Sequence, residues 1–367
     1  MFTPFRRGET FVKGIATFSF FPSVPRFTLL MASTSSTTRT SAYRPALAWF
    51  SLLGSVWVFG VVTLGAFTTS IGAGMAFPDW PLSNGSLNPE GWLTNIAMFA
   101  EHSHRLFGSV MGMISIGLAF WLWKTESRRW LRNLGWTALV IVIIQGILGG
   151  KRVLLDSIEV PGFEMSLGQM LRIPHGVLAQ MFVCILFAIT ASLSRRWSTI
   201  PVTSQTDAGH RASVFTPALR RLALTATALV WVQLVVAAVM RHNQAGLAIP
   251  TFPFTPEGGL VPSTWDFRVG IHFTHRVMAL VLACVLPCLI VSVWRSPAAT
   301  RGYKQSAGVL LGLLVLQVSL GIGSVWSGRD PAYTTAHVIV GACLLALTFA
   351  LTWWIHRDVL AGGGNQP

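Results

Sequence analysis

The sequence predicts an all-α, polytopic membrane protein whose eight transmembrane helices form two parallel-oriented four-helix bundles, related by internal duplication. Three observations support this prediction. The chain is 52% hydrophobic and only 11% charged, its apolar residues gather in eight long runs, and its second half repeats motifs of its first. Such a composition is typical of membrane proteins rather than soluble domains.

Each apolar run is long enough to cross a bilayer, which takes about 20 helical residues. Backbone polar groups in lipid must be hydrogen-bonded within the protein, so only helices or closed barrels can span it. The runs are too long and too continuously apolar for barrel strands. We therefore expect spanning helices at 46–69, 101–123, 134–150, 173–193, 219–240, 271–294, 306–326 and 335–356.

The basic residues alternate between the two sides of this predicted bundle. The net charge is +14, and most of it lies before the first helix and in the connections after helices two, four and six. The other connections hold fewer basic residues, mixed with acidic ones. This is the positive-inside pattern, which places both termini on the cytoplasmic side. We therefore attribute the charge to membrane topology and expect no nucleic-acid partner.

The N-terminal residues 1–45 differ from the rest of the chain. They are basic, rich in Phe and then in Ser and Thr, and poor in acidic residues. Such a composition resembles that of a transit peptide. We prefer to interpret the segment as a disordered tail, or as the result of a misassigned start with Met31 as the true one.

The two halves of the chain repeat four features in the same order. The segments 73–82 and 245–254 both read Ala-Gly-apolar-Ala-apolar-Pro-x-aromatic-Pro-apolar. Four helices per half is an even number, so both halves have the same orientation about an axis along the membrane normal. The expected parts are a half at 46–193, a cytoplasmic linker at 194–218, a half at 219–356 and a tail at 357–367. The other matches are Glu101-x-x-His104-Arg105 with His272-x-x-His275-Arg276, Gln145 with Gln317, and His175 with His337.

Four histidines open the second, fourth, sixth and eighth predicted helices, which all run inward from the outer face. They should therefore share one depth near the outer surface. An ionisable residue in a membrane helix marks a functional site by default, and imidazole is a standard axial ligand of heme iron. One histidine near a helix end is more often interfacial, but the repeat favours ligation by the set. We expect two bis-histidine heme sites, His104 with His175 and His275 with His337.

The remaining candidates distinguish the two sites. Glu101 stands three residues before its ligand, on the same helix face, where the second half has His272. A carboxylate at one site suits proton transfer, although a helix-dipole contact is an alternative. Arg105 and Arg276 either pair with heme propionates or extend to the lipid headgroups. Four histidines without a repeat partner are expected in loops or at interfaces: His102, His210, His242 and His356.

On these residues the chain resembles the heme A synthase family over nearly all of 46–356. The likeness includes the duplicated eight-helix layout, the four histidines with their Glu101 and His272 neighbours, and the loop at 73–81. Some family members carry a cysteine pair in the loop after helix one. Here that loop has none, and the four cysteines lie within predicted helices, so the chain resembles the cysteine-free type and excludes mechanisms that need loop thiols.

The resemblance implies oxidation of the C8 methyl group of heme O to the formyl group of heme A by successive hydroxylations, for cytochrome c oxidase assembly. It implies that His104 and His175 hold the substrate heme, with Glu101 catalytic, and that His275 and His337 hold a heme b cofactor. It also implies heme O synthase as substrate donor, assembly factors of cytochrome oxidase as partners and an electron acceptor of unknown identity. Self-association is left open.

Two other functions fit parts of the pattern. A di-heme b-type electron-transfer cytochrome would use the same four histidines but gives Glu101 no task. A transporter with a duplicated fold would place its polar residues near the bilayer midplane, whereas these histidines gather at one end. We expect a bacterial cell membrane location, or the mitochondrial inner membrane if residues 1–45 are a transit peptide.

Overall fold

The computed structural model describes Met1 and residues 43–199 and 214–362. In these residues eight helices are long and apolar enough to cross a membrane, which confirms the predicted fold class. The described part of the 1–45 tail is too short to test its interpretation. The spans are α1 (Pro45–Ser70), α2 (Ile96–Thr125), α3 (Arg129–Leu154), α4 (Leu167–Leu193), α6 (Pro217–His242), α7 (Phe267–Arg295), α8 (Arg301–Trp326) and α9 (Pro331–Ile355).

Three short helices complete the described chain: α5 (Arg195–Thr199), the 3₁₀ helix η1 (Ala245–Leu247) and α10 (Arg357–Gly362). The predicted linker therefore begins with a helix, and so does the predicted tail. Arg357 of α10 is buried and donates two hydrogen bonds to the carbonyl oxygen of Trp197 in α5. This contact ties the chain after α9 to the chain after α4.

The histidine-bearing helices begin four to six residues before the apolar runs that predicted them. A side chain caps the first turn of each helix by accepting backbone N–H groups. The predicted starts at 101, 173, 271 and 335 become Ile96, Leu167, Phe267 and Pro331. The caps are Asn95, Ser166, Asp266 and Asp330.

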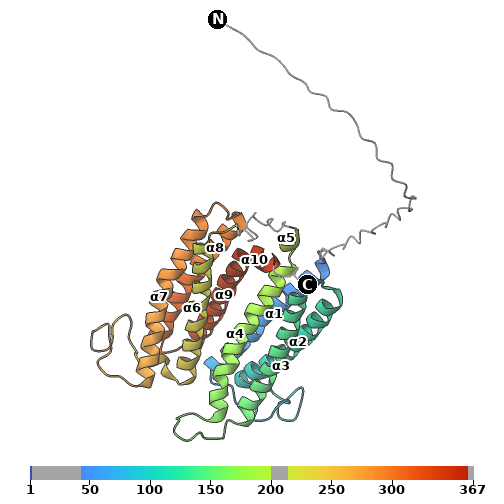
Figure 1. Cartoon of the computed structure of the whole chain (residues 1–367). Coiled ribbons are helices and arrows are strands. Elements are labelled where there is room, and N and C mark those ends of the chain that lie inside the picture. The colour runs from blue at the N-terminus through green and yellow to red at the C-terminus, as the bar shows by residue number, and fades with distance from the viewer. Residues whose placement is uncertain (2–42, 200–213, 363–367) are drawn as a thin grey trace, which may run out of the picture. The chain divides into compact units, whose positions relative to one another are not determined.

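The eight spans pack as two rings of four, α1–α4 and α6–α9, each built around its own apolar core (Figure 1). One interhelical hydrogen bond recurs in both rings. Ser55 on α1 meets Thr190 on α4 at 2.8 Å, and Thr227 on α6 meets Thr352 on α9 at 2.8 Å. Because α1 corresponds to α6 and α4 to α9, the two rings share this hydroxyl–hydroxyl hydrogen bond as well as their helix order.

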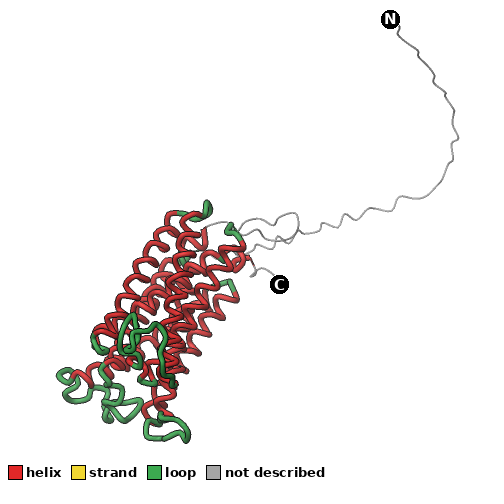
Figure 2. The backbone as a smooth tube through the Cα atoms, turned by 90° about the vertical axis from the view of Figure 1, so that its left-hand side faces the viewer, coloured by secondary structure: helices red, strands yellow, loops and turns green. Residues whose placement is uncertain are grey.

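The rings meet through α4 and α9, with α1 against α9 and α4 against α6. In the most hydrophobic 18 residues of α4 and α9, 56% and 50% are buried, against at most 33% in the other six helices. The loops after α1, α3, α6 and α8 gather at one end of the spans, where the histidine-bearing helices begin (Figure 2). We call this the loop end.

Candidate functional site

The two predicted histidine pairs meet inside the two rings. The ring centres of His104 on α2 and His175 on α4 lie 6.4 Å apart, and those of His275 on α7 and His337 on α9 lie 6.3 Å apart. His104 is eight residues beyond the start of its helix at Ile96. With a rise of about 1.5 Å per residue, that is roughly 12 Å below the loop end. Both pairs therefore lie within the spans, deeper than the predicted helix starts suggest.

This spacing fits a metal ion held between two imidazoles. A metal–imidazole bond of about 2 Å on each side places the ring centres roughly 6 Å apart. In the described residues, no group of three or more His, Cys, Asp or Glu side chains could hold a metal. Two protein ligands per site suit a planar tetrapyrrole, which supplies the other four ligand atoms itself. The residues present therefore fit a heme in each half.

Backbone carbonyls orient one histidine in each pair. Nδ1 of His104 lies 3.1 Å from the carbonyl oxygen of Val61, and Nδ1 of His337 lies 3.1 Å from that of Gln317. A protonated Nδ1 that donates to a carbonyl leaves Nε2 as the one acceptor of the ring, which is the tautomer that a metal-ligating histidine needs. At His337 the side-chain amide nitrogen of Gln317 lies 3.3 Å from this Nε2 and would have to give way to a metal. The partner ligands differ, because the buried Nδ1 atoms of His175 and His275 have no hydrogen-bond partner among the described residues.

Glycines make room for three of the four imidazoles. A Cβ atom on Gly65 of α1 would lie 2.8 Å from Cε1 of His104. On Gly149 of α3 it would lie 3.3 Å from Cε1 of His175, and on Gly321 of α8 it would lie 3.0 Å from Cε1 of His337. Gly149 and Gly321 each follow the matched glutamine of the repeat by four residues, so both halves use the same device.

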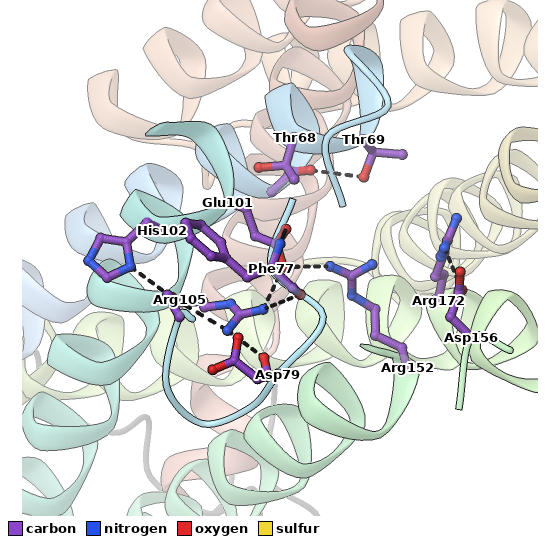
Figure 3. A network of polar contacts seen from close by, with 12 residues as sticks. Thr68, Thr69, Phe77, Asp79, Glu101, His102, Arg105, Arg152, Asp156 and Arg172 are labelled. Atoms are coloured by element: carbon purple, nitrogen blue, oxygen red, sulfur yellow. Dashed lines mark hydrogen bonds and ion pairs between the residues drawn. The ribbon is translucent and has the colours of Figure 1, made fainter. Parts of the chain in front are cut away.

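Glu101 is buried above the first pair, with 1% of its side chain exposed. Its Oε2 accepts the backbone N–H of Phe77 at 3.2 Å, and its Oε1 accepts a hydrogen bond from Arg105 at 2.7 Å (Figure 3). The guanidinium of Arg152 on α3 lies 3.9 Å from Oε1. The carboxylate therefore joins α2, α3 and the loop after α1.

His272 takes the corresponding place in the second half, and its chemistry differs. Its Nδ1 accepts the backbone N–H of Ile249 at 3.2 Å, and Nε of Arg276 lies 3.3 Å from its Nε2. A neutral imidazole can accept at only one of its two nitrogens, so it cannot serve both donors at once. The carboxylate of Glu101 has two acceptor oxygens and accepts from both donors at once. It also places a carboxylate at the first histidine pair, which the second pair lacks.

Arg105 and Arg276 bind the loops that follow α1 and η1. Arg105 donates to the carbonyl oxygens of Phe77 and Asp79, at 3.2 and 2.8 Å, and Arg276 donates to those of Ile249 and Thr251, at 2.8 and 2.7 Å. The four acceptors occupy matching places in the repeat. Both arginines thus hold a loop over a histidine pair, which neither sequence-based alternative included. Their contact with heme propionates stays a prediction.

Asp79 closes the first of these loops. Its carboxylate accepts the backbone N–H groups of Asn84 and Gly85, each at 2.7 Å. Desolvation opposes ionisation of Asp79, but these hydrogen bonds and the charge of Arg105 outweigh it and hold its pKa below the usual range. The ionised carboxylate of Asp79 therefore holds the loop at Asn84 and Gly85 against the start of the same loop.

The expectation that His102 is a loop or interfacial residue is wrong. His102 is 4% exposed, its Nδ1 lies 2.9 Å from the hydroxyl of Ser83, and its ring packs edge-on against Trp92. The loop after α1 folds back over α2 and covers this side chain. The sequence feature that could have indicated this burial is the position of His102 directly after Glu101, a predicted site residue. His210 lies outside the described residues.

Sequence reasoning also missed two arginines near the first pair. Arg152 lies in the last turn of the Gly-rich helix α3, and Arg172 of α4 pairs with Asp156 at 2.7 Å. Both stand close to the matched features that were noticed, Gln145 and His175. Their spacing alone did not reveal that they face the site, because they have no counterpart in the second half.

The model of the COX15-CtaA family, described as cytochrome oxidase assembly protein, matches residues 48–349. The heme A synthase of Bacillus licheniformis is 26% identical over 314 residues, which cover 82% of this chain and 93% of that protein. The heme A synthase of Alkalihalophilus pseudofirmus is 27% identical over 310 residues, covering 82% and 93%. That of Halalkalibacterium halodurans is 24% identical over 319 residues, covering 85% and 98%.

Proposed function

Because the chain belongs to the COX15-CtaA family of cytochrome oxidase assembly proteins, we propose that it is a heme A synthase, an oxidoreductase that converts heme O to heme A. The observation that carries this proposal is the asymmetry of two otherwise matched sites. Each half brings two imidazoles to the spacing of a bis-histidine heme, but only the first half adds a buried carboxylate, Glu101.

The first half is the proposed substrate site, with His104 and His175 holding heme O. With water supplying the oxygen atom, oxidation of a methyl group to a formyl group releases four protons and four electrons. Glu101 is a carboxylate within this half, and Arg105 and the N–H of Phe77 fix its two oxygens. It would accept and pass on such protons, while Arg105 holds the loop after α1 over the site.

The second half is the proposed site of a resident heme b, held by His275 and His337. Bound there, it would supply electron transfer. Gln233 donates to the carbonyl oxygen of His275 at 2.9 Å, and His337 is oriented through the carbonyl of Gln317. The first contact ties α6 to the backbone of α7, the second fixes the ring of His337, and His272 adds no carboxylate that could act as a base.

We further propose the membrane setting and the partners. Both termini would lie on the cytoplasmic side and the loop end on the outer side of a bacterial cell membrane, because the basic residues alternate in this sense. Heme O synthase would supply the substrate, cytochrome oxidase assembly factors would receive the product, and a separate protein or quinone would accept electrons.

The second candidate is a di-heme b-type electron-transfer cytochrome, and the matched geometry of the two pairs favours it. Two equal sites are what an electron carrier needs. It does not explain why one site holds a buried Glu101 where the other holds His272.

Heme analysis after co-expression separates these functions. The chain is expressed with and without a heme O synthase in a host that lacks heme A, and the extracted hemes are separated by chromatography and identified by mass. Heme A, or a hydroxylated precursor, should appear only when both proteins are present. If heme B is bound and heme O stays unchanged even with a reconstituted redox partner, the cytochrome is correct and the synthase is not.

The same assay tests Glu101. Glu101→Gln should lower heme A formation by roughly 10²-fold or more, as expected for loss of a general acid–base group, while the heme B content stays unchanged. Glu164→Gln, which replaces a carboxylate with 84% of its side chain exposed, is the matched control and should behave like the parent chain. Normal heme A formation by Glu101→Gln would contradict the proton-transfer role.

A further inference from the structure

One guanidinium beside the first histidine pair has no carboxylate of its own. Three arginines reach this region from α2, α3 and α4, but only two carboxylates bind them closely. Arg105 pairs with Glu101 at 2.7 Å, and Arg172 pairs with Asp156 at 2.7 Å. Arg152 is the third, and its nearest carboxylate oxygen lies 3.9 Å away, on the Glu101 that Arg105 already engages.

Arg152 is also poorly solvated. Only 14% of its side chain is exposed, and its Nη1 packs against the loop backbone at Gly74, where a Cβ atom would lie 2.8 Å away. Within residues 43–199 and 214–362, its side chain has Glu101 alone in ion-pair range and no hydrogen-bond acceptor. A buried charge without a close partner is costly, particularly near a membrane interior.

The position of this charge points to the porphyrin. Arg152 stands three residues beyond Gly149, which packs against His175, and its guanidinium lies 3.9 Å from the carboxylate of Glu101, three residues before His104. Figure 3 shows it between the Glu101–Arg105 pair and the Arg172–Asp156 pair. A cation so placed can reach an anionic group on a molecule held between the two imidazoles.

A second buried cation raises the positive charge on the same side. Arg241 of α6 crosses to α1, where it donates to the carbonyl oxygen of Ala66 and the hydroxyl of Ser70, both at 2.9 Å. Both of these partners are neutral, and no ion pair to Arg241 occurs in the described part of the chain. The loop end therefore holds more buried positive than negative charge where the rings meet.

We infer that Arg152 binds a propionate carboxylate of the porphyrin held between His104 and His175. This inference rests on the proposed function, which places heme O there. Heme carries two carboxylates on one edge of its ring, and a guanidinium binds a carboxylate through two parallel hydrogen bonds. Arg105 already donates to loop carbonyls and to Glu101, so Arg152 is the arginine here whose donors have no close acceptor among the described residues. Heme O and heme A share these carboxylates, so the contact fixes the orientation of the ring and not the choice between substrate and product.

Binding of heme B and its dimethyl ester tests the inference, because the ester has the same ring and iron without the carboxylate charges. The full chain is purified in a His275→Ala background, so that only the first pair can bind, and each porphyrin is titrated by absorption. Arg152→Gln should weaken heme B binding roughly tenfold or more and change ester binding by less than about twofold. Arg152→Lys keeps the positive charge but cannot form two parallel hydrogen bonds, so its affinity for heme B should lie between those of the parent chain and Arg152→Gln.

Arg268→Gln is the matched control, since Arg268 is a half-exposed arginine of α7 that pairs with Glu164 at the same end. It should leave both affinities unchanged. If Arg152→Gln weakens both porphyrins equally, or neither, Arg152 is a structural counter-ion of Glu101 and the inference is wrong. If the background protein binds neither porphyrin while Arg152 is intact, the bis-histidine site is wrong and the proposed function fails with it.

Discussion

Gly321 on α8 leaves just enough room for the imidazole of His337. Replacing this glycine with alanine should therefore prevent the second histidine pair from binding heme. The added Cβ atom would lie 3.0 Å from Cε1 and 3.6 Å from Nδ1 of the ring, where ordinary contacts are 3.4–4 Å. The ring must therefore retreat by about 0.4–1 Å, the difference between these distances, whereas metal–ligand distances tolerate only about ±0.2 Å. Its Nδ1 is bonded to the carbonyl of Gln317, which limits how far it can turn to compensate.

The assay is the heme-to-protein ratio and the reduced-minus-oxidised spectrum of the purified full chain. Gly321→Ala should lose most of the low-spin b-type signal. Gly312→Ala on the same helix is the control, since its Cβ would meet nothing within 4 Å and alanine favours a helix by up to about 1 kcal/mol over glycine. A Gly321→Ala protein with the parent's heme ratio and spectrum would refute the ligand role of His337 as reasoned here.

Two further predictions concern the scaffold. Thr227→Val and Thr352→Val, singly and together, should show a coupling energy of about 0.6 kcal/mol, the average for membrane hydrogen bonds, in thermal unfolding in detergent; independent effects would mean that this contact does not join α6 to α9. Asp79→Asn should speed proteolysis of the loop 71–95 at pH 7. Because folding lowers the pKa of Asp79, the parent loop should stay protected above the ordinary value of about 3.9 and lose protection only as the pH falls through the lowered pKa; protection lost already between pH 7 and 5 would contradict this assignment.

Two kinds of information in the sequence were sufficient for the fold. A bilayer demands helices of a fixed length with internally bonded backbones, so eight apolar runs give eight spans. The repeat indicates which histidine corresponds to which, and an even number of helices per half places the corresponding residues at one depth. For this reason the pairs His104–His175 and His275–His337 could be named before their distances were known.

The tertiary structure decided what surrounds those pairs. Whether Arg105 meets a propionate, the lipid or a loop carbonyl depends on how the loop after α1 folds back over α2, and apolar periodicity does not specify a loop's path. The same fold buries His102, and the packing of α3 beside α2 and α4 leaves Arg152 without its own carboxylate. These contacts join residues 19 to 51 positions apart in the chain, and their geometry is fixed only when the helices pack. The sequence by itself determined the spans and the matched histidines, because membrane length and duplication act along the chain, whereas the charge balance at each site is a property of side chains brought together in space.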